Sequence, residues 1–587
     1  MSTTAAAVGP TTAEPGRRPL LLDAYAARSC PVKTQHLFEP GATRPAVPEP
    51  APDDPAAVRA EQARRHRAVV LEALIARCAG RVVDLRLLAA DGPDVQGAAT
   101  RRAMADGVAV VVGPVLPVDV AGHRVGAPDL LVRGDDTPAG CPGYHPVLVK
   151  GHLVAQPARP AAEDEKPAAL LVSTLEHPGP ASVRERPGWS LRLRAREPDL
   201  RQLAHAYRML EAAGHAPTAA LGAVIGVDQL DDGPFLCWAD RGEPALRTFA
   251  ADDPRGWRQA SVLERYDAAL ARRLRIARAA ATGRRPLVEP VVVRECASCP
   301  WWARCRARLD DQDVSLRIDR GALDRREVEA LRTLGAGTVP ALAAADLDAL
   351  LPRYLPEVAH RSSGEARLRT AVRRARMLVG GSDFAQETTG PIAVPGAAVE
   401  VDFDLETSAD GRIYLWGFRV ERPAEPGSDR YVAFARFADL DEAAETALAV
   451  EALTWLWGVV EAGDPVVVYH YSGFEVNQIA TLARRSDDPA LAWARAYAEE
   501  HFVDLLEVVQ QHWFGVHGLG LKLIAAHAGF RWRDDDPGGL NSQRWFADAV
   551  HGADDEGRRA ARQRVLDYNE DDVRATRALR AWLRDQR

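Results

Sequence analysis

The spacing of hydrophobic positions divides the first half of the chain into helical and strand-like stretches. Apolar residues three and four apart at Val69, Leu71, Leu74 and Ile75 predict a helix that begins near Ala57. Short apolar runs bounded by Gly, Pro and Asp are typical of strands. Such runs occur at residues 82–88, 108–112, 125–132 and 147–149, and helical spacing returns at residues 200–213 and 261–281. Strands flanked by helices predict an α/β domain that ends near residue 310.

A second α/β pattern begins near residue 398. The apolar runs Val399–Leu405 and Ile413–Val420 predict adjacent strands, joined through Asp410–Gly411, which is a hairpin signal. The elements predicted after them are a helix at 440–460, a strand at 465–469, and helices at 474–483, 519–526 and 560–583. This unit of about 190 residues has the size of one domain.

The residues between the two units have a helical pattern with a glycine break. Two short helices around Gly335–Gly337 are similar to a helix-hairpin-helix, whose turn amides can contact a phosphate, and an ordinary helical spacer is the alternative. The stretch from residue 380 to 396 contains Gly, Ser and Pro and is predicted to be a linker.

Composition places the chain among globular proteins. Its 587 residues predict several domains, and 47% hydrophobic with 27% charged residues is ordinary globular usage. Seven cysteines are too few for a disulfide framework, and the sequence shows neither an N-terminal signal peptide nor about 18 consecutive apolar residues. We therefore expect a cytoplasmic protein with no membrane partner.

Charge is unevenly distributed. The net charge is −8, yet residues 271–308 contain ten arginines against two glutamates, and residues 361–376 contain six arginines against one glutamate. These two basic islands can dock a phosphate backbone or can be solvated helix faces. Lysine is rare, so each lysine that remains indicates a need for a compact ammonium group. The four lysines are Lys33, Lys150, Lys166 and Lys522.

Three cysteines, Cys296, Cys299 and Cys305, fall within ten residues, beside two tryptophans. Clustered cysteines in a cytosolic protein indicate metal binding. Cys30 is the candidate for a fourth thiolate, because the remaining cysteines are isolated in apolar surroundings. An N-terminal cysteine followed by C-x2-C-x5-C resembles the iron-sulfur staple of RecB-like nucleases. The resemblance implies a 4Fe-4S cluster held by these four residues, and zinc is the structural alternative.

The same resemblance implies a PD-(D/E)xK nuclease site between those cysteines. Asp129, after Pro128, matches the first element and would bind a divalent metal, and Lys150 matches the last and would support the attacking water. Leu148 stands where the family has an acid. Gln202 resembles the start of the family's Q-x3-Y motif, and it joins Arg304 of the first basic island as a candidate contact to nucleic acid.

A second acidic pattern lies in the C-terminal unit. Asp404 and Glu406 alternate along a predicted strand and share one face with Asp402. Tyr568 and Asp572, four residues apart in the last predicted helix, also share a face. Taken alone, these could be an exposed edge strand and a solvated helix face.

A strand D-x-E followed near the end by Y-x3-D resembles the DEDDy exonucleases of the RNase H-like superfamily, in its DnaQ-like and YprB-like branch. The resemblance implies two divalent ions, Mg²⁺ or Mn²⁺, and a tyrosine, Tyr568, that orients the nucleophile. Asp504 would support the site, and Lys522 would contact a phosphate. The metal ligands that the resemblance implies are Asp404, Glu406, Glu475 and Asp572.

These patterns together predict a multidomain α/β protein with five segments. They are a tail (1–19), a RecB-like iron-sulfur domain (20–320), a helical connector (321–380), a linker (381–397) and an RNase H-like exonuclease domain (398–587). We expect a metal-dependent nuclease, with a 3′–5′ exonuclease on DNA in repair or recombination as the leading hypothesis. No G-x4-GK[ST] loop occurs, so unwinding would need a separate helicase. The alternative is a catalytically impaired nucleic-acid-binding scaffold for that helicase.

Overall fold

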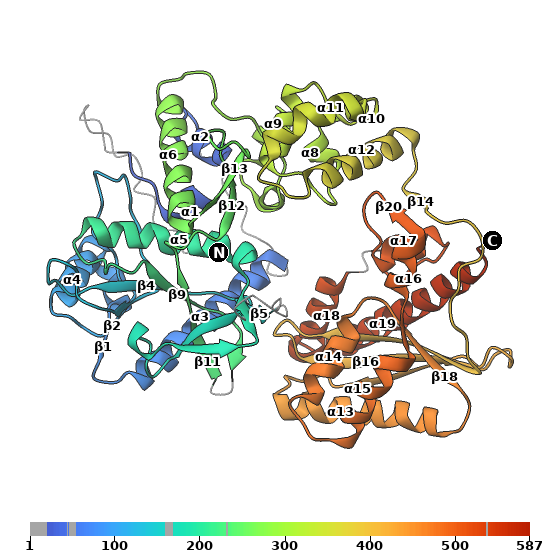
Figure 1. The fold of residues 1–587 in the computed structure, drawn as a ribbon. Coiled ribbons are helices and arrows are strands. Elements are labelled where there is room, and N and C mark those ends of the chain that lie inside the picture. Colours follow the sequence, from blue (N-terminus) through green and yellow to red (C-terminus); the bar gives the residue numbers. More distant parts are fainter. Residues whose placement is uncertain are drawn as a thin grey trace. The chain divides into compact units, whose positions relative to one another are not determined.

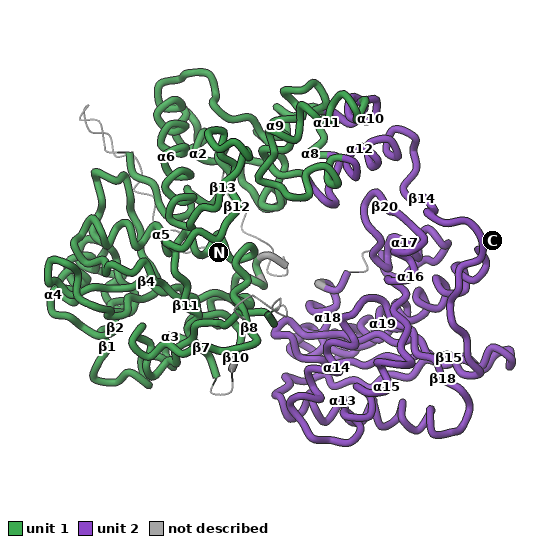
Figure 2. The backbone as a smooth tube through the Cα atoms, in the orientation of Figure 1, with its two compact units in different colours: residues 1–316, 323–337, 346–368 green, residues 317–322, 338–345, 369–587 purple. Residues whose placement is uncertain are grey.

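The computed structural model describes residues 20–43, 45, 55–158, 168–230, 233–535 and 538–586. The predicted tail (1–19) and Lys166 lie outside the described residues. The chain forms two compact units, drawn in green and purple in Figure 2. Unit 1 comprises residues 1–316, 323–337 and 346–368, and unit 2 comprises residues 317–322, 338–345 and 369–587.

A nine-stranded mixed sheet forms the centre of unit 1 (Figure 1). The strand order is β1-β2-β3-β4-β9-β11-β6-β7, with β10 paired to β11. The pairs β1/β2 and β4/β9 are parallel and the others are antiparallel. The strands are β1 (Val82–Asp84), β2 (Val110–Val112), β3 (Leu130–Arg133), β4 (Tyr144–Val149), β6 (Ala169–Thr174), β7 (Arg184–Pro187), β9 (Leu221–Ile225), β10 (Gln229–Leu230) and β11 (Gly233–Asp240). Two ribbons, β5 (Ala155–Pro157) with β8 (Trp189–Leu191) and β12 (Leu246–Phe249) with β13 (Trp257–Ala260), lie outside this sheet.

Helices cover both faces of the unit 1 sheet, and the side-chain alternation of β4 shows how. Leu148 packs in a core with α5, whereas Val147 and Val149 pack in a core with α3 on the opposite face. The helices up to the connector are α1 (Ala24–Arg28), α2 (Pro31–Phe38), α3 (Pro55–Arg77), η1 (Arg86–Asp91), α4 (Pro93–Ala105), η2 (Pro180–Ser182), α5 (Leu193–Ala212), α6 (Val262–Ala281), η3 (Arg294–Ser298), α7 (Trp302–Arg306) and α8 (Val314–Arg317).

Three predicted strands of unit 1 are shorter than the sequence pattern indicates, and the one predicted at 108–112 begins at Val110. The strand predicted at 82–88 ends at Asp84, because the Asp84 carboxylate accepts the backbone N–H of Arg86 at 3.0 Å and starts the helix η1. The strand predicted at 125–132 begins only at Leu130, because Pro128 before it has no N–H to donate.

The connector contains short helices in both units. They are α9 (Arg325–Thr333), α10 (Val339–Ala343), α11 (Leu347–Tyr354), η4 (Leu355–Val358) and α12 (Gly364–Gly380). Gly335 has a φ of 80°, the left-handed conformation that the predicted glycine turn requires. The residues predicted to be a linker contain a strand, β14 (Phe384–Gln386), which pairs with β20 (Trp513–Gly515) because Phe384 packs against His527 at a ring distance of 4.6 Å.

Unit 2 is built on a five-stranded sheet with the order β17-β16-β15-β18-β19. The first two pairs in this order are antiparallel and the last two are parallel. The strands are β15 (Val399–Thr407), β16 (Ile413–Glu421), β17 (Arg430–Ala435), β18 (Val466–His470) and β19 (Phe502–Asp504). The helices are α13 (Glu442–Glu461), α14 (Phe474–Ala483), α15 (Pro489–His501), α16 (Leu505–His512), α17 (Leu521–His527), α18 (Gly539–His551) and α19 (Asp555–Arg584).

The two faces of β15 have different roles in this sheet. Val401, Phe403 and Leu405 enter an apolar core with α13 and α15. Their neighbours along the strand are acidic and face the other side, where α19 packs against β15 and β16. Among the described residues one helix, α13, is long and apolar enough to cross a membrane. Leu448, Leu453 and other residues of α13 are buried on the sheet, and 33% of its most apolar window is buried.

Candidate active site: a buried carboxylate cluster

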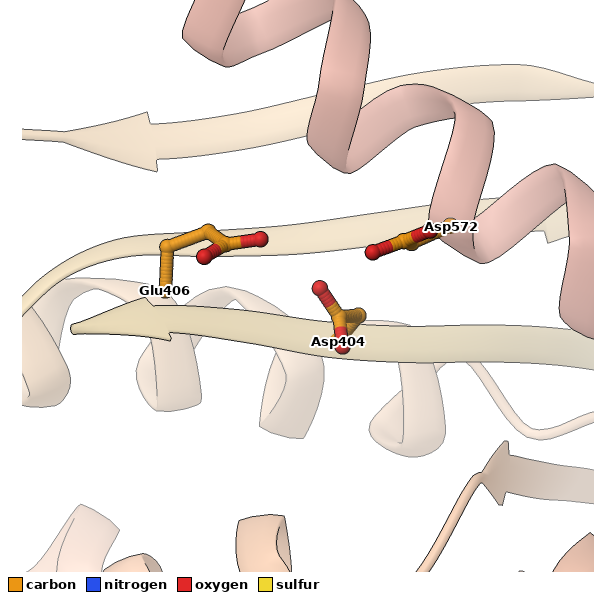
Figure 3. Close-up of side chains that lie close together, drawn as sticks. All are labelled: Asp404, Glu406 and Asp572. Atoms are coloured by element: carbon orange, nitrogen blue, oxygen red, sulfur yellow. The ribbon is translucent and has the colours of Figure 1, made fainter. Parts of the chain in front are cut away.

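Three carboxylates from β15 and α19 meet above the sheet of unit 2. Asp404 and Glu406 point from β15 toward Asp572 on α19 (Figure 3). One oxygen of each group lies within 4.8 Å of an oxygen of the other two, and Glu406 and Asp572 are buried. The structure therefore brings together acids that lie more than 160 residues apart in the sequence. We call Asp404, Glu406 and Asp572 the carboxylate cluster.

Burial and mutual repulsion strongly disfavour ionisation of this cluster. Burial, followed by the neighbouring Asp572, raises the pKa of Glu406 to about 8. Burial and then Glu406 raise the pKa of Asp404 well above its usual value, and burial also raises the pKa of Asp572. Three carboxyl groups this close together, two of them buried, are costly unless a cation neutralises their charge.

Each member of the cluster is held by a neutral hydrogen-bond donor. Asn569 Nδ2 donates to Asp404 Oδ2 at 2.7 Å, and Tyr431 Oη donates to Asn569 Oδ1 at 2.8 Å. In the same way Ser542 Oγ donates to Glu406 Oε2 at 2.7 Å. The indole of Trp532 donates to Asp572 Oδ1 at 2.7 Å. Neutral donors fix the orientation of a carboxylate and leave its charge available for a metal ion.

Asn569 reaches Asp404 only because β16 has a glycine opposite it. Gly417 pairs with Asp404 across the sheet, and a Cβ atom on Gly417 would lie 1.6 Å from Asn569 Oδ1. Neither Asn569 nor Ser542 was predicted from the sequence. Asn569 lies next to Tyr568 in the motif, whereas no local signal points to Ser542.

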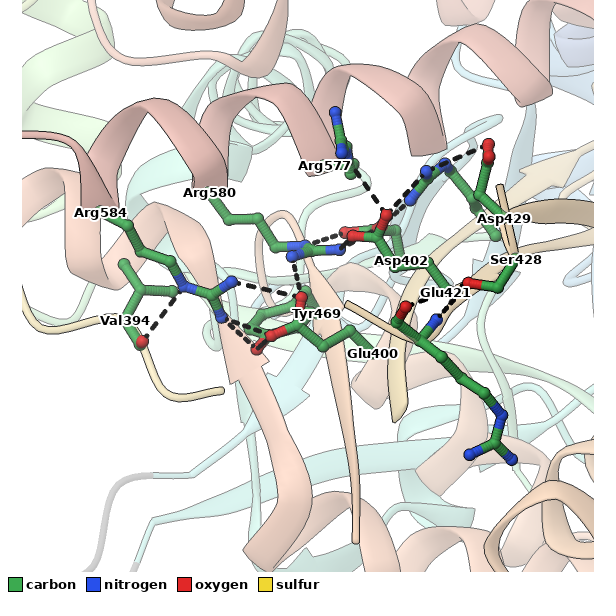
Figure 4. Close-up of polar contacts among 12 residues, drawn as sticks. Val394, Glu400, Asp402, Glu421, Ser428, Asp429, Tyr469, Arg577, Arg580 and Arg584 are labelled. Atoms are coloured by element: carbon green, nitrogen blue, oxygen red, sulfur yellow. Dashed lines mark hydrogen bonds and ion pairs between the residues drawn. The ribbon is translucent and has the colours of Figure 1, made fainter. Parts of the chain in front are cut away.

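Asp402, on the same face of β15, has a different environment. Arg580 Nε donates to Asp402 Oδ1 at 2.8 Å, and the same guanidinium pairs with Glu400 and Glu421 (Figure 4). Arg580 lies on α19, two turns after Asp572. This buried ion-pair network fixes α19 on β15 and β16, and it shows that Asp402 balances a guanidinium instead of joining the cluster.

Tyr568 and Lys522 lie beside Asp572. Lys522 Nζ donates to Tyr568 Oη and lies 3.6 Å from Asp572 Oδ2. The ammonium also lies 4.3 Å from the centre of the Tyr568 ring. Burial, followed by the negative charge of Asp572, raises the pKa of Tyr568, so the phenol stays protonated.

Glu475 is close to the cluster without belonging to it. It starts α14 after the end of β18, and its charge contributes to the raised pKa of Asp404. Its Oε2 atom is buried, has no hydrogen-bond partner, and lies 3.6 Å from His470 Nδ1. Asp504 caps α16 and accepts the N–H of Ser472 at 2.8 Å, which is a supporting position.

The donor set of unit 2 fits divalent metal ions. Carboxylate oxygens are the ligands that Mg²⁺ and Mn²⁺ prefer. The cluster offers three, and the unpartnered Oε2 of Glu475 offers a fourth nearby. A bound cation would remove the repulsion that raises the pKa values of these acids.

The four predicted cysteines line one cavity in unit 1. Cys30 caps α2, Cys296 and Cys299 lie in and after η3, and Cys305 lies in α7. Burial raises the pKa of three of these thiols, that of Cys305 to about 11, and the thiols add to each other's shifts. Because adjacent thiolates repel one another, this donor set fits a metal centre that carries positive charge.

The predicted site around Asp129 does not fit a metal ion. Arg67 Nη2 lies 2.6 Å from Asp129 Oδ1, and the other oxygen accepts the N–H of Val149 at 2.7 Å. A guanidinium therefore already neutralises this carboxylate. Leu148, where an acid was expected, lies in the apolar core below α5.

Lys150 is enclosed by polar groups of α5. Its ammonium donates to Gln202 Oε1 at 2.9 Å and lies 3.7 Å from Asp199 Oδ1. Burial lowers the pKa of Lys150, and the charges of Arg28 and Arg67 contribute. Asp199 was not predicted, because it lies next to Pro198 inside a helix without a recognisable motif. Arg304, a predicted nucleic-acid contact, forms an ion pair with Glu39.

Comparison with known families agrees with the topology of unit 2. Residues 401–584 match a family model of the RNase H superfamily, a span that contains all three members of the carboxylate cluster. The C-terminal part of the chain is therefore an RNase H-like domain, as predicted. Comparison with curated proteins and with solved structures gives no match.

Proposed function

We propose that this protein is a metal-dependent nuclease that hydrolyses phosphodiester bonds at the carboxylate cluster of unit 2. The observation that carries the proposal is the meeting of Asp404, Glu406 and Asp572, buried and held by neutral donors. The RNase H superfamily match of the same residues supports it.

Each residue of the site has an assigned role. Asp404, Glu406 and Asp572 would hold two divalent ions, Mg²⁺ or Mn²⁺, with Glu475 completing the ligand set. When bound, such ions activate a water molecule and neutralise charge on the phosphate. Tyr568 stays protonated beside Asp572 and would donate a hydrogen bond that orients the attacking oxygen. Lys522 would contact a non-bridging phosphate oxygen.

We further propose that the substrate is DNA, that cleavage is exonucleolytic from the 3′ end, and that the protein acts in repair or recombination. The D-x-E and Y-x3-D pattern supports the exonuclease assignment. A time course on single strands labelled at the 5′ or the 3′ end, made of DNA or RNA, tests it. A ladder that shortens from the 3′ end of DNA is expected, whereas internal cuts or cleavage of RNA alone would contradict the assignment.

We also propose that the four cysteines that line one cavity of unit 1 hold a 4Fe-4S cluster, with zinc as the other candidate. Four thiols on three separate segments would tie the start of the described chain to residues 296–305. Protein purified without oxygen should be brown and contain about four iron atoms per chain. Stoichiometric zinc in iron-replete preparations would reject the cluster.

A second function, nucleic-acid binding without catalysis, has support in unit 1 alone. Arg67 pairs with Asp129, and the charges of Arg28 and Arg67 act on the neighbouring Lys150. Such a unit would bind nucleic acid for a separate helicase, while unit 2 hydrolyses its phosphodiester bonds. Asp129→Ala should therefore leave metal-dependent cleavage almost unchanged. Loss of cleavage in this variant, with Asp404→Ala still active, would reverse the assignment of the two sites.

A further inference from the structure

An open pocket of about 350 Å³ lies in unit 2, apart from the carboxylate cluster. Two arginines, Arg320 and Arg374, line it together with Gln510, Phe514 and the loop at residues 515–520. Three of the six residues in that loop are glycines, Gly515, Gly518 and Gly520, so backbone rather than side chains forms this wall. The pocket is therefore open, and two cationic side chains line it beside apolar ones.

The loop holds both arginines by their Nε atoms. Arg320 Nε donates to the carbonyl of His517 at 3.0 Å, and Arg374 Nε donates to the carbonyl of Val516 at 3.0 Å. Phe514 lies under the Arg374 guanidinium, 5.1 Å from its Cζ atom. These contacts position each guanidinium and leave its terminal NH₂ groups for a ligand.

Neither guanidinium has a carboxylate partner among the described residues. Asp319, which directly precedes Arg320, pairs with His517 Nδ1 at 2.9 Å. Burial lowers the pKa of Arg374, with Arg320 contributing and Asp319 opposing. Two guanidiniums that repel each other and have no carboxylate partner attract an anion.

In the basic island at residues 361–376, several arginines bind carboxylates or carbonyls of the protein, whereas Arg374 lines the pocket. Arg361 pairs with Asp324 at 2.6 Å, and Arg367 pairs with Glu327 at 2.7 Å. Arg373 pairs with Glu387, and Arg376 donates to the carbonyl of Ala343. Most of the island thus serves intramolecular contacts, and Arg374 is the residue that lines an open pocket.

The pocket is joined to the carboxylate cluster by two short links. Lys522, beside Tyr568 and Asp572, follows the pocket residue Gly520 by two positions. The hydroxyl of Tyr471 donates to the carbonyl of Leu519, and Tyr471 directly follows β18 on the way to Glu475. A strand bound in the pocket would continue past Lys522 into the cluster.

We propose that this pocket binds the phosphodiester backbone of the nucleic-acid strand that enters the carboxylate cluster, with Arg320 and Arg374 contacting its phosphate oxygens. The inference rests on the proposed nuclease function. Gln510 and the open glycine loop leave room for the sugars, and no base-specific contact is required. The pocket therefore selects for a nucleic-acid backbone rather than for a sequence.

The test measures binding of the full-length protein to a fluorescent DNA single strand of about 20 nucleotides. Fluorescence anisotropy in Ca²⁺ gives the Kd at several KCl concentrations. Each phosphate contact on a single strand contributes about −0.7 to the slope of log K against log salt. Arg320→Gln, which changes an exposed residue, should reduce the slope by about 0.7, and the double change with Arg374→Gln by about 1.4. Arg361→Gln is the matched control, because that arginine is paired with Asp324 and does not line the pocket, and it should keep the wild-type slope.

Two results would overturn the proposal. One is a wild-type slope in the double variant. The other is displacement of the DNA by inorganic phosphate at constant ionic strength, which would assign the pocket to a free anion. Hydrolysis of the p-nitrophenyl ester of thymidine 5′-monophosphate by the wild-type protein in Mn²⁺ separately tests the cluster. If the ester is not cleaved but the slope changes as expected, the proposed nuclease function fails and the pocket stands.

Discussion

Glu406→Gln should stabilise the sheet of unit 2 when no divalent metal is present. Burial and then Asp572 raise the pKa of Glu406 from its usual value of 4.5 to about 8. The unfolded chain releases this proton near pH 4.5, whereas the folded chain keeps it until about pH 8. The contribution of the Glu406 carboxyl group to the free energy of unfolding is therefore fully present below pH 4.5 and is lost as the pH rises to 8.

The size of the effect follows from this window. Each rise of one pH unit costs about 1.4 kcal/mol, so the loss reaches about 3 kcal/mol at pH 7 and about 4 kcal/mol at pH 8. The neutral amide has no such loss and can still accept the hydrogen bond of Ser542. The variant should recover this free energy in a chelator, and divalent metal should stabilise it much less than the wild type.

The free energy of opening of this sheet can be measured by hydrogen exchange of the β15 and β16 amides. The exchange is followed by mass spectrometry between pH 5 and 8, and the rates are corrected for the intrinsic exchange rate at each pH. Glu421→Gln is the matched control. Although burial favours its neutral form, Arg419 and Arg580 hold the pKa of Glu421 at about 2. Its stabilisation is present above pH 4.5 and is lost as the pH falls to 2. Glu421→Gln should therefore destabilise the sheet by about 3 kcal/mol at pH 7, with or without metal.

The reasoning would be refuted if Glu406→Gln weakened protection of β15 at pH 8 in the chelator. That result would mean that the cluster carries no repulsion for a metal ion to relieve. An unchanged pH dependence of the wild type on addition of Mg²⁺ would lead to the same conclusion.

Four further substitutions test the site and the cysteine cavity. Asp404→Ala should abolish Mn²⁺-dependent cleavage of end-labelled DNA, while Tyr568→Phe should lower the rate and leave metal affinity, measured by calorimetry, unchanged. Gly417→Ala should displace Asn569, with which its new Cβ would collide, and reduce cleavage at least tenfold in a folded protein, as checked by circular dichroism. Cys30→Ser should lower the iron content and the melting temperature of unit 1, and wild-type values for both would exclude this residue as a ligand.

The sequence predicted the elements of unit 2 and three of its clustered acids because strand alternation and helical spacing are local. Asp404 and Glu406 share a face because strand side chains alternate, and Tyr568 and Asp572 share one because they lie four residues apart in a helix. The partners of these acids could not be predicted. Ser542 reaches Glu406, and Asn569 requires Gly417, only because separate elements pack together, and no local pattern encodes such contacts.

In unit 1 as well, the sequence pattern did not predict contacts between separate elements. The cysteine spacing predicted residues that do line one cavity. The motif around Asp129 predicted a metal site, whereas the structure pairs that carboxylate with Arg67 from a helix more than 50 residues earlier. A single guanidinium supplied from elsewhere in the fold is enough to change the chemistry that a motif suggests.

The division of the carboxylate cluster between β15 and α19 also governs when the site can exist during synthesis. A ribosome that has made Glu406 must add 166 more residues before Asp572 is present. At 5–20 residues per second this takes roughly 10–30 s. Throughout that interval the nascent chain lacks one wall of the site, and an interrupted chain never acquires it. The proposed cleavage of nucleic acid therefore cannot begin beside the messenger that encodes the chain until helix α19 has been made.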